Sequence, residues 1–206
     1  MIYNQNMTVE EIIQQSVKEA KLLTQQNRRK WVRRLLNYYG GNATNQYIKD
    51  YFSSSAFQEV PCYNANFTRR FINKMSRIYT VGTSRNVNRQ YDQLTIKKDA
   101  RFKHVERMTR LMGTVATQII YKENNGEPYF DYRPVYYFNV HLSDPFTPSA
   151  IMYPLLMQSD DVSYIEKCEW AYWDEAIYAH YDEDGNIIEE YEHGYGVLPF
   201  VFTHRE

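Results

Sequence analysis

Several features that mark other protein classes are scarce or missing in this sequence. No apolar run approaches the roughly 20 residues that cross a bilayer, so we expect no membrane contact. The first residues, Met1 to Asn6, lack the basic and then apolar pattern of a secretory signal. Only Cys62 and Cys168 are present, with no pairing pattern, which favours reduced thiols in a cytosolic-type compartment over a disulfide framework.

The motifs of the common enzyme classes are also missing. There is no glycine-rich phosphate loop, no strand-borne GxGxxG and no nucleophile elbow. The five histidines do not stand at metal-ligand spacing with one another or with the cysteines, and each is expected at the surface or in a hydrogen bond. Asp160-Asp161 and Asp182-Glu183-Asp184 do not fit the calcium-loop pattern. We therefore expect a protein that is not an enzyme and holds no metal or cofactor.

Charges of both signs are present in nearly equal number but are unevenly distributed. The net charge is −1, yet residues 1–110 hold 20 Lys and Arg against 8 Asp and Glu, a balance of +12. Residues 111–206 hold 4 against 17, a balance of −13. This split predicts two electrostatically distinct faces. The basic half would meet nucleic acid, or the acidic half of a neighbouring subunit or of its own chain.

The densest basic segment places five cations within seven residues: Arg28, Arg29, Lys30, Arg33 and Arg34. These are candidates for contact with nucleic-acid phosphates or with an acidic neighbouring subunit. On a helix they form i, i+4 pairs on one side, while Trp31 and Leu35 are expected to face the core, so a solvated helix face is the alternative. A second basic set spreads more widely around its helix: Lys97, Lys98, Arg101 and Lys103.

The first half of the chain predicts helices. Thr8 with Glu11 forms a capping box that begins a helix near Val9. The polar stretch 24–30 predicts a break or a solvated segment, and the glycine pair at 40–41 ends this helical region. Further helices are predicted over 43–52, from an Asn64 cap to Gly82, and over 91–112. Apolar residues at helical spacing are expected in the core: Ile13, Val17, Ala20, Phe67, Phe71, Met75, Ile78, Leu94, Phe102, Val105, Met108 and Met112.

After Gly113 the sequence predicts strands, because β-branched and aromatic residues predominate. The expected strands cover 114–121, 129–133, 136–140, 150–156, 163–173, 176–181, 187–191 and 197–202. Turns are expected at Asn124–Gly126, at two Pro-containing sites (144–145 and 147–148), and at 174–175 and 182–186. Helices followed by strands give an α+β fold, with 1–112 as a helical part and 113–206 as a mostly antiparallel β-rich part.

Tyrosine is abundant, with 20 residues against 10 Phe and 3 Trp. A tyrosine can bury its ring while its hydroxyl reaches water or a partner, which suits sheets that pack against other subunits. A Tyr-rich sheet without such a partner is the alternative.

Five motifs occur in an order that resembles the portal proteins of tailed bacteriophages. Residues 37–42 (NYYGGN), after a long first helix, resemble the family's "YY-G" element. Residues 64–82 are similar to its next segment, in which an Asn precedes a helix that ends in Tyr and Gly. Residues 136–153 and the hairpin at 170–181 continue the order. Residues 193–202 (HGYGVLPFVF) resemble the family's closing strand.

The resemblance implies the wing region of a portal subunit, one copy of a homo-oligomeric ring, usually a dodecamer, at one capsid vertex. Phage DNA would be packaged and ejected through this ring, with terminase, capsid and tail-adaptor proteins as partners. The protein would be assembled in the host cytoplasm and reside in the virion. The family's stem and clip follow the closing strand and are not present in this chain, so no tunnel-lining residue is assigned. The alternative is a nucleic-acid-binding module that uses the basic N-terminal helices.

Overall fold

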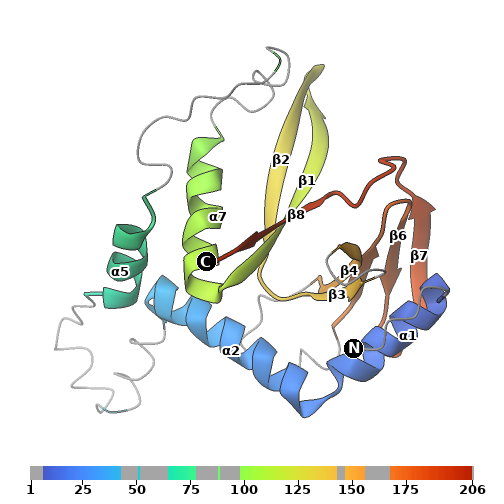
Figure 1. Cartoon of the computed structure of the whole chain (residues 1–206), viewed down its shortest axis with the longest axis horizontal. Coiled ribbons are helices and arrows are strands. Elements are labelled where there is room, and N and C mark those ends of the chain that lie inside the picture. Colours follow the sequence, from blue (N-terminus) through green and yellow to red (C-terminus); the bar gives the residue numbers. More distant parts are fainter. Residues whose placement is uncertain are drawn as a thin grey trace.

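The computed structural model describes residues 7–42, 51, 65–77, 88, 98–142, 147–155 and 168–205. It has the expected α+β fold, in which the described helices precede Gly113 and the described strands follow it (Figure 1). The predicted helix over 43–52 lies outside the described residues except for Tyr51. Other predicted features also lie outside the described residues: Cys62, Asn64, Ile78, Gly82, Leu94, Lys97, the 144–145 turn and Asp160-Asp161.

Helices α1 (Val9–Ala20) and α2 (Leu23–Gly40) form a bent pair along one side of the molecule (Figure 1). The predicted capping box is confirmed, since Glu11 N donates to Thr8 Oγ1 (3.3 Å) and Thr8 N donates to Glu11 Oε2 (3.0 Å). The break between the helices lies at Lys21 and Leu22, before the polar stretch 24–30, which is helical. Glutamine and arginine in that stretch are good helix formers, so polarity alone does not interrupt the helix. Gly41, in left-handed backbone with φ 88°, ends α2 as expected.

Helix α5 (Phe67–Met75) begins at Asn66, not at the predicted Asn64, because the Asn66 side chain accepts from Arg69 N at 2.9 Å. Its buried residue is Ile72. The stripe that was expected in the core is exposed, with 77% of Phe67, 64% of Phe71 and 43% of Met75 accessible. In helix α7 (Asp99–Met112), by contrast, Val105 and Met108 are buried as predicted.

A three-stranded antiparallel sheet has the order β2-β1-β8. Strands β1 (Thr114–Asn124) and β2 (Glu127–Val135) form a long hairpin whose turn is the predicted one, with Asn125 and Gly126 at φ 52° and 80°. Strand β8 (Phe200–His204) adds to the other edge of β1, in the register Ala116 opposite Phe202. It begins three residues later than the sequence predicts, and Pro199 just before it contributes only its carbonyl oxygen, which accepts from Ile119 N at 2.9 Å.

A five-stranded antiparallel sheet follows chain order: β3 (Asn139–Leu142), β4 (Pro148–Pro154), β5 (Trp170–Trp173), β6 (Ile177–Tyr181) and β7 (Ile187–Glu192). The two predicted hairpin turns, β5 to β6 and β6 to β7, are confirmed. Pro148 begins β4 opposite Leu142 and does not form a turn, a position at which a strand tolerates proline. Residues 136–138, expected in a strand, connect the two sheets instead.

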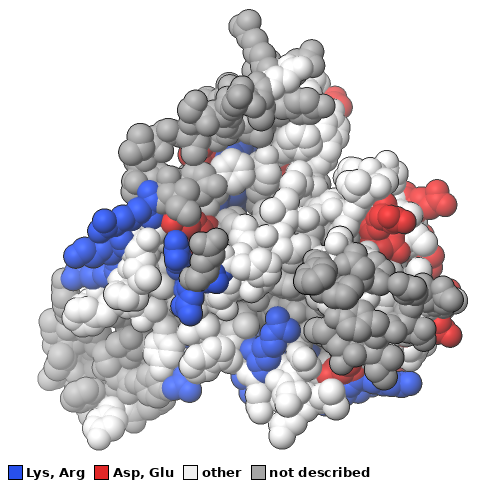
Figure 2. Space-filling model, viewed as in Figure 1, with Lys and Arg blue, Asp and Glu red and all other residues white. Residues whose placement is uncertain are grey.

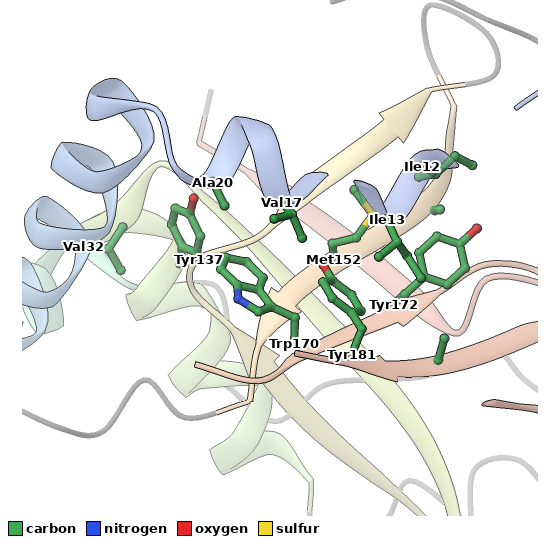
Figure 3. Packing of buried hydrophobic residues seen from close by; sticks show 12 residues of the cluster. Ile12, Ile13, Val17, Ala20, Val32, Tyr137, Met152, Trp170, Tyr172 and Tyr181 are labelled. Carbon is green, nitrogen blue, oxygen red and sulfur yellow. The ribbon is translucent and has the colours of Figure 1, made fainter. Parts of the chain in front are cut away.

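One core joins the helical part to the five-stranded sheet. Ile13 and Val17 of α1 and Val32 of α2 pack against buried aromatic side chains (Figure 3). Those aromatics come from the inter-sheet connection and the sheet itself: Tyr137, Trp170, Tyr172 and Tyr181. A second cluster, which includes Ala116, Phe138 and Phe200, joins the two sheets. The helices are therefore fixed relative to the strands by shared burial, which is the main stabilising term in folding.

Candidate functional site

The five cations of the densest basic segment do not share one surface. Arg29 is only 5% exposed, and its guanidinium carbon lies 5.6 Å from the Tyr137 ring centroid and 5.7 Å from that of Trp170. Arg28 donates to the carbonyl oxygen of Phe138 at 3.1 Å and lies over the same Tyr137 ring. Arg29 therefore attaches α2 to the sheet and to the inter-sheet connection, whereas Arg28 reaches the connection from an exposed position.

The other three cations lie toward solvent to different degrees. Lys30 and Arg34 are exposed and Arg33 is half-buried. Arg34 donates to the Tyr38 hydroxyl at 3.2 Å. Trp31, expected in the core, is 57% exposed, because Arg29 and Val32 occupy the inward face of the helix instead. An arginine can take this place because its guanidinium is attracted to aromatic faces, a preference that apolar periodicity does not register.

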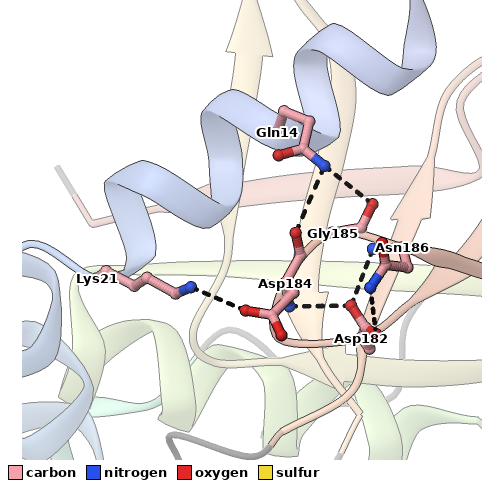
Figure 4. Close-up of polar contacts among 6 residues, drawn as sticks. All are labelled: Gln14, Lys21, Asp182, Asp184, Gly185 and Asn186. Atoms are coloured by element: carbon pink, nitrogen blue, oxygen red, sulfur yellow. Dashed lines mark hydrogen bonds and ion pairs between the residues drawn. The ribbon is translucent and has the colours of Figure 1, made fainter.

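The acidic run at 182–184 forms a turn that holds helix α1. The Asn186 side-chain amide donates to Asp182 Oδ2 at 2.8 Å, and Asp182 Oδ1 accepts from the backbone N–H groups of Asn186 and Asp184, each at 2.9 Å (Figure 4). These bonds, that from the Asn186 side chain first, lower the pKa of Asp182. Gln14 Nε2 donates to the carbonyls of Asp184 and Gly185 at 3.4 and 3.3 Å. Lys21 Nζ lies 3.3 Å from Asp184 Oδ1. Part of the basic half thus meets the acidic half of its own chain.

Gly185 is the sensitive residue of this turn. We expect Gly185→Ala to lower the free energy of unfolding by about 2–3 kcal/mol, measured by urea denaturation. Its φ is 85°, and an added Cβ would lie 2.7 Å from Gln14 Nε2, which would then lose its bonds to the turn. The matched control is Gly126→Ala, with φ 80° and open space around the added Cβ, expected to cost about 1–2 kcal/mol. Equal losses would mean that the Gln14 contact contributes nothing.

Exposed cations and acids are unevenly placed over the molecule but not fully separated, since Lys21 of α1 pairs with Asp184 close to β7. In Figure 2 the basic side chains lie mostly over the helices on the left and along the lower side, whereas acidic side chains gather on the right near β7. The helical end carries the α5 outer face, which we define by five of the six exposed residues of α5, Arg69 excepted: Phe67, Arg70, Phe71, Lys74 and Met75. The sheet end carries the β7 edge, defined as residues 188–192: Ile188, Glu189, Glu190, Tyr191 and Glu192.

Helix α5 is held with this face outward by polar contacts on its other side. Asn66 Nδ2 donates to the backbone oxygen of Tyr39 at 2.9 Å, and the Tyr39 hydroxyl donates to Asn73 Oδ1 at 3.1 Å. Arg69 lies over the Tyr39 ring, 5.8 Å from its centroid. With Ile72 buried on the same inner side, residues 67, 71 and 75 must face away.

Strand β7 ends the five-stranded sheet, and its residues 188–192 are exposed. On one face Tyr191 packs against Tyr178, with ring centroids 4.9 Å apart, and Tyr178 in turn packs against Trp173 at 4.7 Å. The strand is thus anchored by aromatic contacts while its glutamates remain in solvent.

The five histidines all make hydrogen bonds, as expected. His104 Nε2 lies 2.8 Å from the Tyr136 hydroxyl, and burial together with nearby Arg101 and Arg107 lowers its pKa. His180 Nε2 lies 2.9 Å from Glu169 Oε2. The others contact hydroxyl or carbonyl groups: His141, His193 and His204. Among the described residues, no three His, Cys, Asp or Glu side chains gather in a way that could hold a metal ion.

A groove of about 710 Å³ lies between α7 and the three-stranded sheet. Its lining includes the apolar side chains of Phe102, Val105 and Ile119 and the charged Glu106 and Arg110. The lining thus mixes apolar with polar side chains, and Glu106 among them is buried. No helix within the described ranges is long and apolar enough to cross a membrane.

Comparison with protein-family models and with curated proteins finds no match to this chain.

The sequence indicated the uneven charge, but not these two surfaces. The apolar stripe of α5 was visible and assigned to the core. The run Glu189-Glu190-Tyr191-Glu192 has three acids in four residues, a pattern that departs from the alternation of a half-buried strand and signals an exposed edge.

Proposed function

We propose that this protein is a structural ring subunit, the wing part of a tailed-bacteriophage portal, and not an enzyme. The observation that carries the proposal is the placement of exposed cations on α5 and of exposed glutamates on β7, at the two ends of the folded body (Figure 1). Copies arranged head to tail place a basic end against an acidic end at every contact. Such a heterologous contact closes into a ring when the rotation per subunit is right.

Contacts between the motifs of the portal resemblance support the same proposal. Tyr39, from the first motif, holds Asn66 and Asn73 of the second through the hydrogen bonds described above. His193, from the closing motif, packs against Trp173 of the hairpin motif, with ring centroids 5.3 Å apart, and contacts the Asp174 carbonyl at 3.1 Å. Segments distant in sequence are thus used together, as expected if they belong to one conserved arrangement of elements.

In this role the ring would sit at one capsid vertex, pass phage DNA during packaging and ejection, and contact capsid, tail-adaptor and terminase proteins. The test is native mass spectrometry of the protein at neutral pH. We expect closed rings of a single stoichiometry that dissociate as salt is raised, because exposed charge pairs are screened within about 10 Å at 0.1 M salt. A protein that stays monomeric at every concentration and salt would overturn the proposal.

A further inference from the structure

We infer that the α5 outer face of one copy docks on the β7 edge of the next. This inference rests on the proposed ring and names the two surfaces that would meet in it. The α5 outer face is an apolar stripe beside two cations. Phe67, Phe71 and Met75 follow one another at four-residue spacing, and Arg70 and Lys74 lie alongside them at the same spacing. An exposed stripe of this kind on a soluble helix marks a surface that is covered in an assembly.

The β7 edge offers the complementary chemistry. Glu190 and Glu192 lie on one face of the strand and Glu189 and Tyr191 on the other, where Tyr191 packs against Tyr178. The strand therefore presents carboxylates on both faces, and Ile188, at the register shift of β7, supplies exposed apolar area. Charges on an edge strand would by themselves only protect it from pairing with other strands. Protection does not call for an exposed isoleucine among the charges, whereas docking of an apolar stripe does.

Charge decides which surfaces can meet. If two α5 outer faces met, Arg70 and Lys74 of one copy would face Arg70 and Lys74 of the other. If two β7 edges met, carboxylates would face carboxylates. Like charges placed face to face cost several kcal/mol, so both two-fold arrangements are disfavoured. The pairing of unlike surfaces is the arrangement that removes both apolar areas from water and neutralises both sets of charge.

The placement of the two surfaces allows every copy to use both. Helix α5 lies at the left end of the longest axis in Figure 1 and β7 at the right end. One copy can therefore donate its α5 face to one neighbour and accept α5 from the other without the contacts interfering. Both surfaces are anchored to the core, through Tyr39 and Ile72 on one side and through the Tyr178–Tyr191 contact on the other.

The experiment reverses the charges of each surface separately and then together. One variant carries Arg70→Glu and Lys74→Glu, and another carries Glu190→Lys and Glu192→Lys. Each is expected to weaken self-association by roughly 100-fold in native mass spectrometry and sedimentation, because unlike pairs become like pairs. A chain with all four changes regains rings, and so does an equimolar mixture of the two double variants.

Matched controls carry charge reversals of the same kind at exposed positions outside the two surfaces. Lys18→Glu with Arg133→Glu, and Glu123→Lys with Glu127→Lys, alter the net charge equally but leave both surfaces intact. They are expected to form rings as the unmodified protein does. Circular dichroism and urea unfolding of every variant establish that a lost ring is not a lost fold.

The outcomes separate this inference from the proposed function. Rings in the unmodified protein that survive both reversals, or that the controls disrupt equally, overturn the docking surfaces and leave the portal proposal standing. A monomeric unmodified protein overturns both. If the Arg70 and Lys74 changes abolish binding to double-stranded DNA while rings persist, the α5 outer face is a nucleic-acid surface and the inference is wrong.

Discussion

Trp170→Ala is expected to lower the free energy of unfolding by about 3–5 kcal/mol, the usual range when a buried Trp is truncated. Trp170 is 5% exposed and stacks on Tyr181 with ring centroids 6.4 Å apart. It also meets Tyr137 edge-on and forms one of the two aromatic faces over Arg29. Its removal leaves a cavity where α1, α2 and the five-stranded sheet meet. It also removes one of the two aromatic rings that contact the buried guanidinium of Arg29.

The matched control is Trp31→Ala on α2. Trp31 is 57% exposed, so its truncation should change stability by no more than about 0.5 kcal/mol, as for other surface substitutions. Urea denaturation of both variants at neutral pH gives the comparison. Trp170→Phe, which keeps an aromatic face, should fall between the two. Similar losses for Trp170→Ala and Trp31→Ala would contradict the assignment of Trp170 to the core and of Trp31 to solvent.

The second large effect is unfolding in alkali. Burial raises the pKa of Tyr153 to about 12 and that of Tyr136 to about 12, with nearby Arg101 acting in the opposite direction on Tyr136. Burial also raises the pKa of Tyr137, Tyr172 and Tyr181, and the Asp174 carboxylate adds to the effect on Tyr172. The folded protein therefore keeps several phenols neutral at a pH where the unfolded chain ionises them.

The direction of the pH dependence follows from this difference. Below the unfolded tyrosine pKa of about 10 both states are protonated and the contribution to stability is fully present. It is lost as pH rises through the folded pKa values, because the unfolded state then binds fewer protons. Each such tyrosine costs up to about 1.4 kcal/mol per pH unit, so several together exceed a typical stability of about 5–15 kcal/mol before pH 13.

Tyrosinate absorbance and circular dichroism, recorded together during an alkaline titration, test this expectation. A late group of tyrosines should ionise in one cooperative step that coincides with loss of secondary structure. Tyr153→Phe should reduce the number of protons released on unfolding by about one, so that the free energy of unfolding falls less steeply as pH rises. Ionisation of all tyrosines in a single step near pH 10, with the fold intact, would contradict the burial of these hydroxyls.

Local sequence predicted the described elements well where a specific residue sets the backbone. The Thr8 and Glu11 capping box, the αL residue Gly41 and the Asn125-Gly126 turn all lie where they were expected. Such signals need only neighbouring residues, since a cap or a tight turn is completed by hydrogen bonds within a few positions. Element bounds without such a residue, as at the start of β3 and β8, were displaced by about three positions.

The candidate surfaces were less predictable than the elements that carry them. The sequence marked a stripe on α5 that was assigned to the wrong side, and a cationic run on α2 in which Arg29 and Trp31 were assigned to the wrong side. Phe67 and Phe71 face solvent while Ile72 is buried, and Arg29 is buried while Trp31 is exposed. Periodicity shows that a helix has two faces, but it does not show which of them a distant segment will cover.

By itself the sequence determined the α+β composition, the order of helices and strands, the positions of the tight turns and the division of charge between the two halves. Those properties depend on residue type and on contacts within a few residues. Only the tertiary structure decided that hydrogen bonds to Tyr39 hold the apolar stripe of α5 toward solvent. It alone decided that Arg29 is buried against the rings of Tyr137 and Trp170. It also placed α5 and β7 at opposite ends of the molecule (Figure 1). These outcomes depend on contacts between residues tens to more than a hundred positions apart, whose energies no local pattern contains.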